Sequence, residues 1–149
     1  MRPEEIEEMR HLPLFAGVAP QHVERMLRSS FLQRFPGRID LAREGDPADF
    51  LHVVVEGQVE VYSGYRDRET TVAVLGAGAS FILAAVLLDR VYLKSARTLT
   101  PSRILLLSAE AVRDAFAVDA AFARTLASEV ALAYRGVNKE LTNQKLRSS

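Results

Sequence analysis

Residues 44–62 read EGDPADFLHVVVEGQVEVY, and this stretch decides the fold of the chain. Its G-D-P triplet favours a tight turn, and its E-G pair favours a second one. An apolar, β-branched run from Phe50 to Val55 lies between the two turns, and Val59 to Tyr62 then alternates apolar and polar side chains. Such alternation is typical of a strand with one buried face. The stretch therefore predicts two short strands joined by a glycine turn.

Similar turn signals surround this stretch on both sides. Between Phe35 and Leu107, turns containing Gly or Pro recur at roughly ten-residue spacing, and short β-branched or aromatic runs separate them. Two of these runs are Thr70 to Leu75 and Ile104 to Leu107. This spacing predicts a small antiparallel sandwich or barrel. Arg66 to Glu69 alternates in charge and is expected to form an exposed hairpin loop.

Helices are expected before the strand region. Pro3 to Met9 begins with Pro and is rich in Glu, and both features suit the N-terminal end of a helix. Pro20 to Arg28 also begins with Pro, and its Val23, Met26 and Leu27 fall on one face.

A long helix is expected at the C-terminal end. Ser108 suits a helix N-cap, and no strong breaker follows it except Gly136. A helix of about 25 residues would be roughly 38 Å long, more than a small β-domain covers. Its apolar residues follow alternating steps of three and four, which predicts self-association through a coiled-coil seam. The predicted dimer-helix residues are Leu126, Val130, Tyr134, Val137 and Leu141. A helix that packs on its own sandwich is the alternative.

Composition excludes several classes of protein. The chain has 149 residues, 48% of them apolar, which suits one domain with a sizeable core. It has no Cys, which excludes a disulfide scaffold, a zinc finger and a thiolate-held iron–sulfur cluster. Nineteen basic residues balance nineteen acidic ones, which argues against nucleic-acid binding through bulk charge.

Motifs for targeting and for catalysis are also missing from the sequence. The N-terminus has no apolar signal region, and the longest apolar run, Phe81 to Leu88, is far shorter than the ~20 residues of a membrane helix. No G-x-S-x-G, H-E-x-x-H or P-loop motif occurs. We therefore expect a cytoplasmic protein without a membrane partner that is not an enzyme, with no catalytic residues and no metal site.

Residues 44–62 resemble the cyclic-nucleotide-binding domain superfamily. Within it, they look most like the sensory half of bacterial regulators related to the catabolite activator protein and the fumarate–nitrate regulator. LFAGV at 14–18 resembles the family's entry motif, GAGASF at 76–81 the approach to its ligand cassette, and SART at 95–98 the strand leaving it. The resemblance implies a mainly β fold with flanking helices, namely a double-stranded β-helix or jelly-roll-like β-roll, followed by a long helix that makes a parallel homodimer.

The resemblance also implies the domain organisation. Residues 1–118 would form the N-terminal helices and the β-roll, and residues 119–149 the dimerisation helix. In the family a helix-turn-helix domain follows that helix, whereas this sequence ends where that domain would begin. We therefore expect the chain to be part of a longer regulator that contacts DNA only through the further domain.

Three positions of the cassette depart from the pattern of the nucleotide-binding relatives, which reads roughly F-G-E-(L/A)-A and, further on, R-(S/T)-A. The resemblance places Ile82 at the Gly position, Leu83 at the Glu position and Lys94 at the Arg position. Ile adds a branched side chain, Leu leaves a buried ribose hydroxyl unpaired at a cost of ~1–3 kcal/mol, and Lys lacks the bidentate fork of Arg. These changes disfavour a cyclic nucleotide. The predicted ligand pocket comprises Phe81, Ile82, Leu83, Ala84, Ala85, Lys94 and Ser95.

The apolar cassette is similar to that of relatives that respond to nitric oxide or carbon monoxide, some of which hold haem near this region. Haem would be the cofactor in that case, and its iron needs an axial ligand, commonly His. The candidates are His11, His22, His52 and Tyr92. None of the three His residues lies in the cassette, and a His near an apolar surface is more often packed or solvated than a ligand.

We therefore expect an effector-sensing and dimerisation domain of a DNA-binding transcription regulator. Its small-molecule effector is unidentified, with haem and nitric oxide among the candidates. One alternative is a cyclic AMP- or cyclic GMP-binding regulatory domain in which Lys94 and Ser95 hold the phosphate. The other is a ligand-free dimerisation module.

Overall fold

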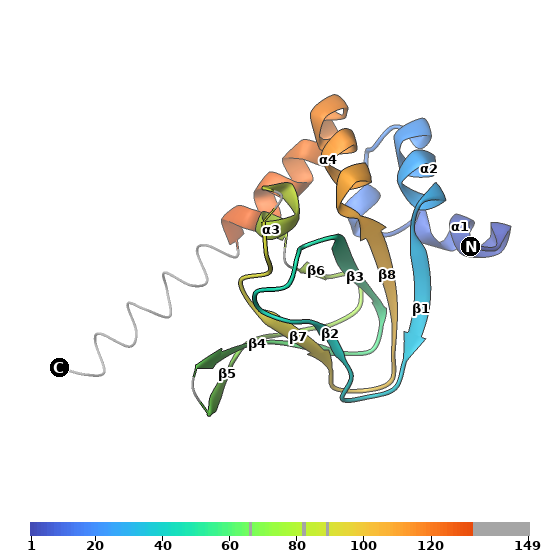
Figure 1. Ribbon diagram of the computed structural model, residues 1–149. Helices are drawn as coiled ribbons and strands as arrows, with labels where there is room; N and C mark the ends of the chain where they lie inside the picture. Colours follow the sequence, from blue (N-terminus) through green and yellow to red (C-terminus); the bar gives the residue numbers. More distant parts are fainter. Residues whose placement is uncertain (66, 82, 89, 133–149) are drawn as a thin grey trace.

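The strands form two four-stranded antiparallel sheets that face each other as a β-roll (Figure 1). The computed structural model describes residues 1–65, 67–81, 83–88 and 90–132. One sheet has the order β1-β8-β3-β6, and the other has the order β2-β7-β4-β5. The strands are β1 (Phe31–Phe35), β2 (Asp40–Ala42), β3 (Phe50–Glu56), β4 (Val59–Tyr65), β5 (Arg68–Leu75), β6 (Ser80–Phe81), β7 (Ser95–Thr98) and β8 (Ser102–Ser108). The predicted mainly β fold is thus confirmed.

Helices flank the roll, as expected. They are α1 (Pro3–Met9), the 3-10 helix η1 (Pro13–Phe15), α2 (Pro20–Arg28), α3 (Leu83–Leu87) and α4 (Ala109–Val118), and residues 120–132 are also helical. Pro starts α1, η1 and α2, where its missing N–H has no helical partner to lose. Figure 1 shows α2 and α4 side by side at one end of the roll. None of the helices within the described ranges is both long and apolar enough to cross a membrane.

Strand β3 is central to the core. It lies between β8 and β6, and its residues from Leu51 to Val54 are all buried, so both of its faces are covered. This explains why its sequence is a continuous apolar run rather than an alternating one. The alternating residues of β4 begin with Val59 and Val61, which are buried in the same core.

The glycine turn after β3 is required by the fold. Gly57 has a φ of 97°, a conformation that side chains rarely adopt. A Cβ at this position would lie 2.2 Å from Oγ of Ser102 and 2.7 Å from the carbonyl oxygen of Pro101. Only Gly therefore fits at this turn, which connects β3 with β4 and passes close to the start of β8. The predicted turn is confirmed.

Two local expectations need correction. Arg66 to Glu69 was expected to be a loop, but Arg68 and Glu69 belong to β5 and pair with Tyr65 and Gly64 of β4. The backbone ladder of the β4–β5 hairpin thus extends into this charged segment.

The second correction concerns the helical region after Ala109. No breaker was expected there before Gly136, yet α4 ends at Val118 and Asp119 adopts an extended conformation. The carboxylate of Asp119 accepts a hydrogen bond from the backbone N–H of Phe122, which makes Asp119 the N-cap of the next helix.

Candidate functional site

The cassette forms the end of the roll beside β3. Phe81 pairs in register with His52 of β3, and α3 follows directly after β6. Phe81, Leu83 and Ala85 are buried, and Ala84 is half-buried. The Leu83 side chain is 7% exposed and belongs to the hydrophobic core. The position that the resemblance aligns with Glu is therefore a core position; Ile82 lies outside the described residues.

The turn at the start of residues 44–62 holds the segment that leaves the cassette. The backbone N–H of Gly45 donates to the carbonyl of Tyr92 at 2.8 Å, and that of Ala48 donates to the carbonyl of Arg90 at 3.0 Å. In return, the N–H of Tyr92 donates to the carbonyl of Asp46 at 2.8 Å. The sequence motif that decides the fold thus also positions the chain between α3 and β7.

Lys94 and Ser95 lie at the end of this segment. The Ser95 hydroxyl is buried and accepts a hydrogen bond from the backbone N–H of Glu44 at 3.0 Å. Lys94 is half-buried and forms no ion pair with any residue of the described ranges. The Ser95 hydroxyl is therefore already bound to a backbone N–H of the site. Lys94 carries a positive charge that has no ion-pair partner among the described residues.

His52 is the buried titratable side chain of the site. It is 2% exposed, stacks on the ring of Phe81 with a centroid distance of 5.0 Å, and meets the Tyr92 ring edge-on at 6.2 Å. Its Nδ1 has no hydrogen-bond partner in the described part of the chain. Burial lowers the pKa of His52 to about 4, although backbone groups of Phe50 and Leu41 partly oppose this change. The imidazole is therefore neutral at physiological pH.

Tyr92 fixes the backbone of β3 at the same place. Its side chain is 5% exposed, and its hydroxyl donates to the carbonyl of Phe50 at 2.9 Å and accepts from the N–H of Phe50 at 3.3 Å. Burial raises the pKa of Tyr92. A hydroxyl with two backbone partners is not free to ligate a metal without releasing β3.

The four candidate haem ligands therefore have different surroundings. The His52 ring contacts both Tyr92 and Phe81, whereas the other two candidates are elsewhere. His11 follows α1 and lies 3.5 Å from the Glu7 carboxylate, with 78% of its side chain exposed. His22 is in α2 and is bound to Asp119. Of these residues within the described part of the chain, His52 is the buried one whose ring has an unpartnered nitrogen.

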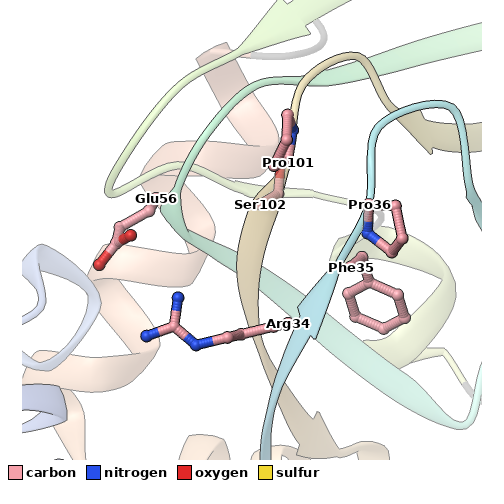
Figure 2. A pocket seen from close by; sticks show the side chains of 6 residues that line it. All are labelled: Arg34, Phe35, Pro36, Glu56, Pro101 and Ser102. Atoms are coloured by element: carbon pink, nitrogen blue, oxygen red, sulfur yellow. The ribbon is translucent and has the colours of Figure 1, made fainter.

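Two hollows of the described surface lie away from the cassette. Figure 2 shows one of about 410 Å³ at the ends of β1, β3 and β8. It is lined by Arg34, Phe35, Pro36, Glu56, Pro101 and Ser102. The other, of about 250 Å³, lies between α1 and α2. Neither is lined by a predicted pocket residue.

The first part of the C-terminal helix packs on its own domain. Leu126 is 0% exposed and is part of the hydrophobic core, and Val130 packs against that core. These two residues thus follow the alternative of a helix on its own sandwich. Tyr134, Val137 and Leu141 lie outside the described residues, and Leu132, which no prediction included, is 64% exposed.

Asp119 is the junction residue that the sequence analysis missed. Besides capping Phe122 at 2.9 Å, its carboxylate accepts from Nδ1 of His22 at 2.7 Å and from the N–H of Ala19 at 3.0 Å. The hydrogen bond from His22, followed by those from the two backbone groups, lowers the pKa of Asp119 to about 2. An Asp before a run of helix-forming residues is an N-cap signal, and could have revealed this break.

Comparison with known proteins agrees with this geometry. The sequence profile of the cyclic nucleotide-binding domain matches residues 32–119, more than half of the chain. The CRP-like protein Clp of Xanthomonas campestris is 39% identical over 57 residues, which are 38% of this chain. The matched part corresponds to only 25% of the length of Clp.

Solved structures share the arrangement of the whole domain. The catabolite activator protein of Thermus thermophilus matches with a TM-score of 0.75 and 26% identity, over 89% of this chain and 63% of its own. The sensor domain of the transcriptional regulator DNR from Pseudomonas aeruginosa matches with a TM-score of 0.72 and 22% identity, over 87% of this chain and 91% of its own, and supports the fold alone. By its profile and its two-sheet roll, the chain belongs to the cyclic nucleotide-binding domain family.

Proposed function

We propose that the chain is the effector-sensing and dimerisation domain of a DNA-binding transcription regulator, and that its effector is not a cyclic nucleotide. The observation that carries the second part is the burial of Leu83 in the hydrophobic core, at the position that the resemblance aligns with the family's Glu. A ribose hydroxyl placed beside Leu83 would lose its water without gaining an acceptor, at a cost of ~1–3 kcal/mol. Lys94 alone would then have to hold the phosphate, without the fork of Arg.

The regulator role is supported by the relatives. The solved structure at 26% identity is named as a catabolite activator protein, and the relative at 39% identity as the CRP-like protein Clp. In this role residues 1–118 form the sensor and residues 119–149 the helix that joins two copies, and DNA is bound by a further domain. The domain works in the cytoplasm. A signal in the cassette would shift the population between two packings of the helix pair.

Calorimetric titration with cyclic AMP and cyclic GMP tests the choice of effector. We expect no saturable heat from the wild-type chain, because the cassette lacks the ribose acceptor. Lys94→Ala is the matched control, since heat that persists in this variant does not come from the cassette. Saturable micromolar binding that Lys94→Ala abolishes would favour the alternative of a cyclic-nucleotide-binding domain.

Haem is the cofactor that one observation favours. His52 is neutral, and a neutral imidazole is the form that binds a metal. Its Nδ1 has no hydrogen-bond partner within the described residues. Bound haem would supply an iron that binds diatomic gases. Titration with haemin, followed by its Soret band, tests this version: a shift in the wild type that is lost in His52→Phe and kept in His11→Gln supports it. A wild-type spectrum identical to that of free haemin would remove haem and leave another small molecule, or no ligand, as the effector.

A further inference from the structure

Leu126 and Val130 pack the helix of residues 120–132 against the core, and its further contacts with the rest of the domain lie at two levels. At its base, Asp119 binds α2, and Phe122 stacks on Phe15 with a centroid distance of 6.5 Å. About three turns further along, roughly 15 Å at 1.5 Å per residue, the carboxylate of Glu129 accepts a hydrogen bond from the hydroxyl of Ser80. The helix thus connects the N-terminal segment with β6.

The second contact reaches the strand that leads into the cassette. Ser80 and Phe81 make up β6, which pairs with β3 through Val53 and His52. The stack of Phe81 on His52 belongs to the candidate effector site. A displacement of the cassette that moves β6 would therefore change the position of the Ser80 hydroxyl relative to the helix.

The two attachments differ in strength. The Asp119 carboxylate has three hydrogen-bond donors, and the apolar contact of Phe122 accompanies them. Glu129 is half-buried, and Ser80 is its hydrogen-bond partner within the described residues. Burial raises the pKa of Glu129, and the Ser80 bond opposes this. A half-buried carboxylate with one hydrogen-bond partner depends on that bond to offset the cost of its partial removal from water. When the partner moves, most of this offset is lost.

We propose that the bond between Ser80 and Glu129 is the coupling contact through which the cassette sets the direction of the C-terminal helix, with Asp119 as the pivot. The inference rests on the proposed function, because it assigns the effector to the cassette. An effector that moves β6 breaks the one polar contact at the distal level, while the apolar packing of Leu126 and Val130 and the contacts at the base hold. Ser80 and Glu129 are thus positioning residues and need not touch the effector.

Hydrogen exchange of the full chain, read by mass spectrometry, tests the coupling in both directions. Ser80→Ala should speed exchange in residues 124–132 about tenfold, a ratio that corresponds to roughly 1.4 kcal/mol. Glu129→Ala should speed exchange by a similar factor in α3, on the far side of the contact. Glu129→Gln keeps an acceptor oxygen and should restore most of the protection in α3.

Thr71→Ala is the matched control. The Thr71 hydroxyl also donates to a glutamate carboxylate, that of Glu60, but on the exposed face of the β4–β5 hairpin. It should leave both the helix and α3 unchanged. Exchange that rises only within the substituted element would overturn the proposal, as would equal loss in Glu129→Gln and Glu129→Ala. If Ser80→Ala unfolds globally, the two Glu129 variants decide.

The outcome is separable from that of the proposed function. Exchange is measured without any effector, so a missing response refutes the coupling contact whatever the cassette binds. Micromolar binding of a cyclic nucleotide would instead refute the proposed effector class and leave an observed coupling in place.

Discussion

Replacing His52 by Phe should remove a large part of the acid sensitivity of this protein. The pKa of His52 falls from 6.5 to about 4 on folding, because the imidazole is buried among aromatic rings. Between these two pKa values the unfolded chain binds a proton at His52, whereas the folded protein does not. Folding stability is at its full value above pH 6.5 and declines as the pH falls from there towards about 4.

The size of this decline follows from the two pKa values. At about 1.36 kcal/mol per pH unit, a fall from 6.5 to about 4 corresponds to roughly 3 kcal/mol. This is a substantial part of the ~5–15 kcal/mol by which a typical domain is stable. The pKa of Asp119 is lowered from 3.8 to about 2, so its contribution is lost only at more acid pH.

Urea unfolding at a series of pH values measures the effect. Phe keeps the ring contact with Phe81 but also removes the hydrogen bonds of the imidazole with the backbone of Phe50 and Leu41, so the two proteins are compared by how their stability changes with pH. The wild type should then lose roughly 3 kcal/mol more than the variant as the pH is lowered to about 4. The exposed His11 gives the control, His11→Gln, which should follow the wild type. If the free energies of unfolding of the wild type and of His52→Phe fall in parallel as the pH is lowered, His52 does not cause the loss of stability in acid.

Further substitutions test three individual contacts by urea unfolding. Gly57→Ala and Gly45→Ala both place a side chain at positive φ, at ~1–2 kcal/mol each, but only the Cβ at Gly57 would lie 2.2 Å from a side-chain oxygen of β8. Gly57→Ala should therefore cost at least ~1–3 kcal/mol more, and equal costs would contradict the tight turn. Tyr92→Phe should cost ~1–3 kcal/mol, because it leaves both backbone groups of Phe50 without their partner; an unchanged stability would refute the clamp. The wild type should lose stability as the pH falls from 3.8 to about 2, because the Asp119 carboxylate becomes protonated in this range. Asp119→Asn should lack this loss, and a variant that still shows it would contradict the assignment to Asp119.

The strands that could be predicted are those in which composition and turn signals agree. The alternation from Val59 to Tyr62 and the glycine turn before it predicted β4 from local residues alone, although β4 extends to Tyr65. Strands β1, β2 and β6 gave no such signal. β1 is an edge strand with mixed polarity, and β6 has only two residues, so both depend on pairing with distant strands. Tertiary contacts of this kind have no local pattern.

The candidate site was predictable in its residue types but not in its surroundings. The resemblance placed Leu83 at an acceptor position, and the sequence alone could not show that it lies in the core. His52 was one of several possible haem ligands, and only the fold separates it from His11 by burial. The contact of Ser80 with Glu129 joins residues far apart in the chain and has no motif.

Sedimentation of the 149-residue chain measures whether the C-terminal helix joins two copies of the sensor. Val137→Asp places a charge on the predicted seam, and Asn138→Asp adds the same charge beside it. We expect the wild type and Asn138→Asp to sediment as dimers at high micromolar concentration and Val137→Asp to be a monomer, because an unpaired charge in an apolar seam is strongly unfavourable. A wild-type chain that is monomeric under these conditions, or a Val137→Asp variant that remains a dimer, would contradict this expectation.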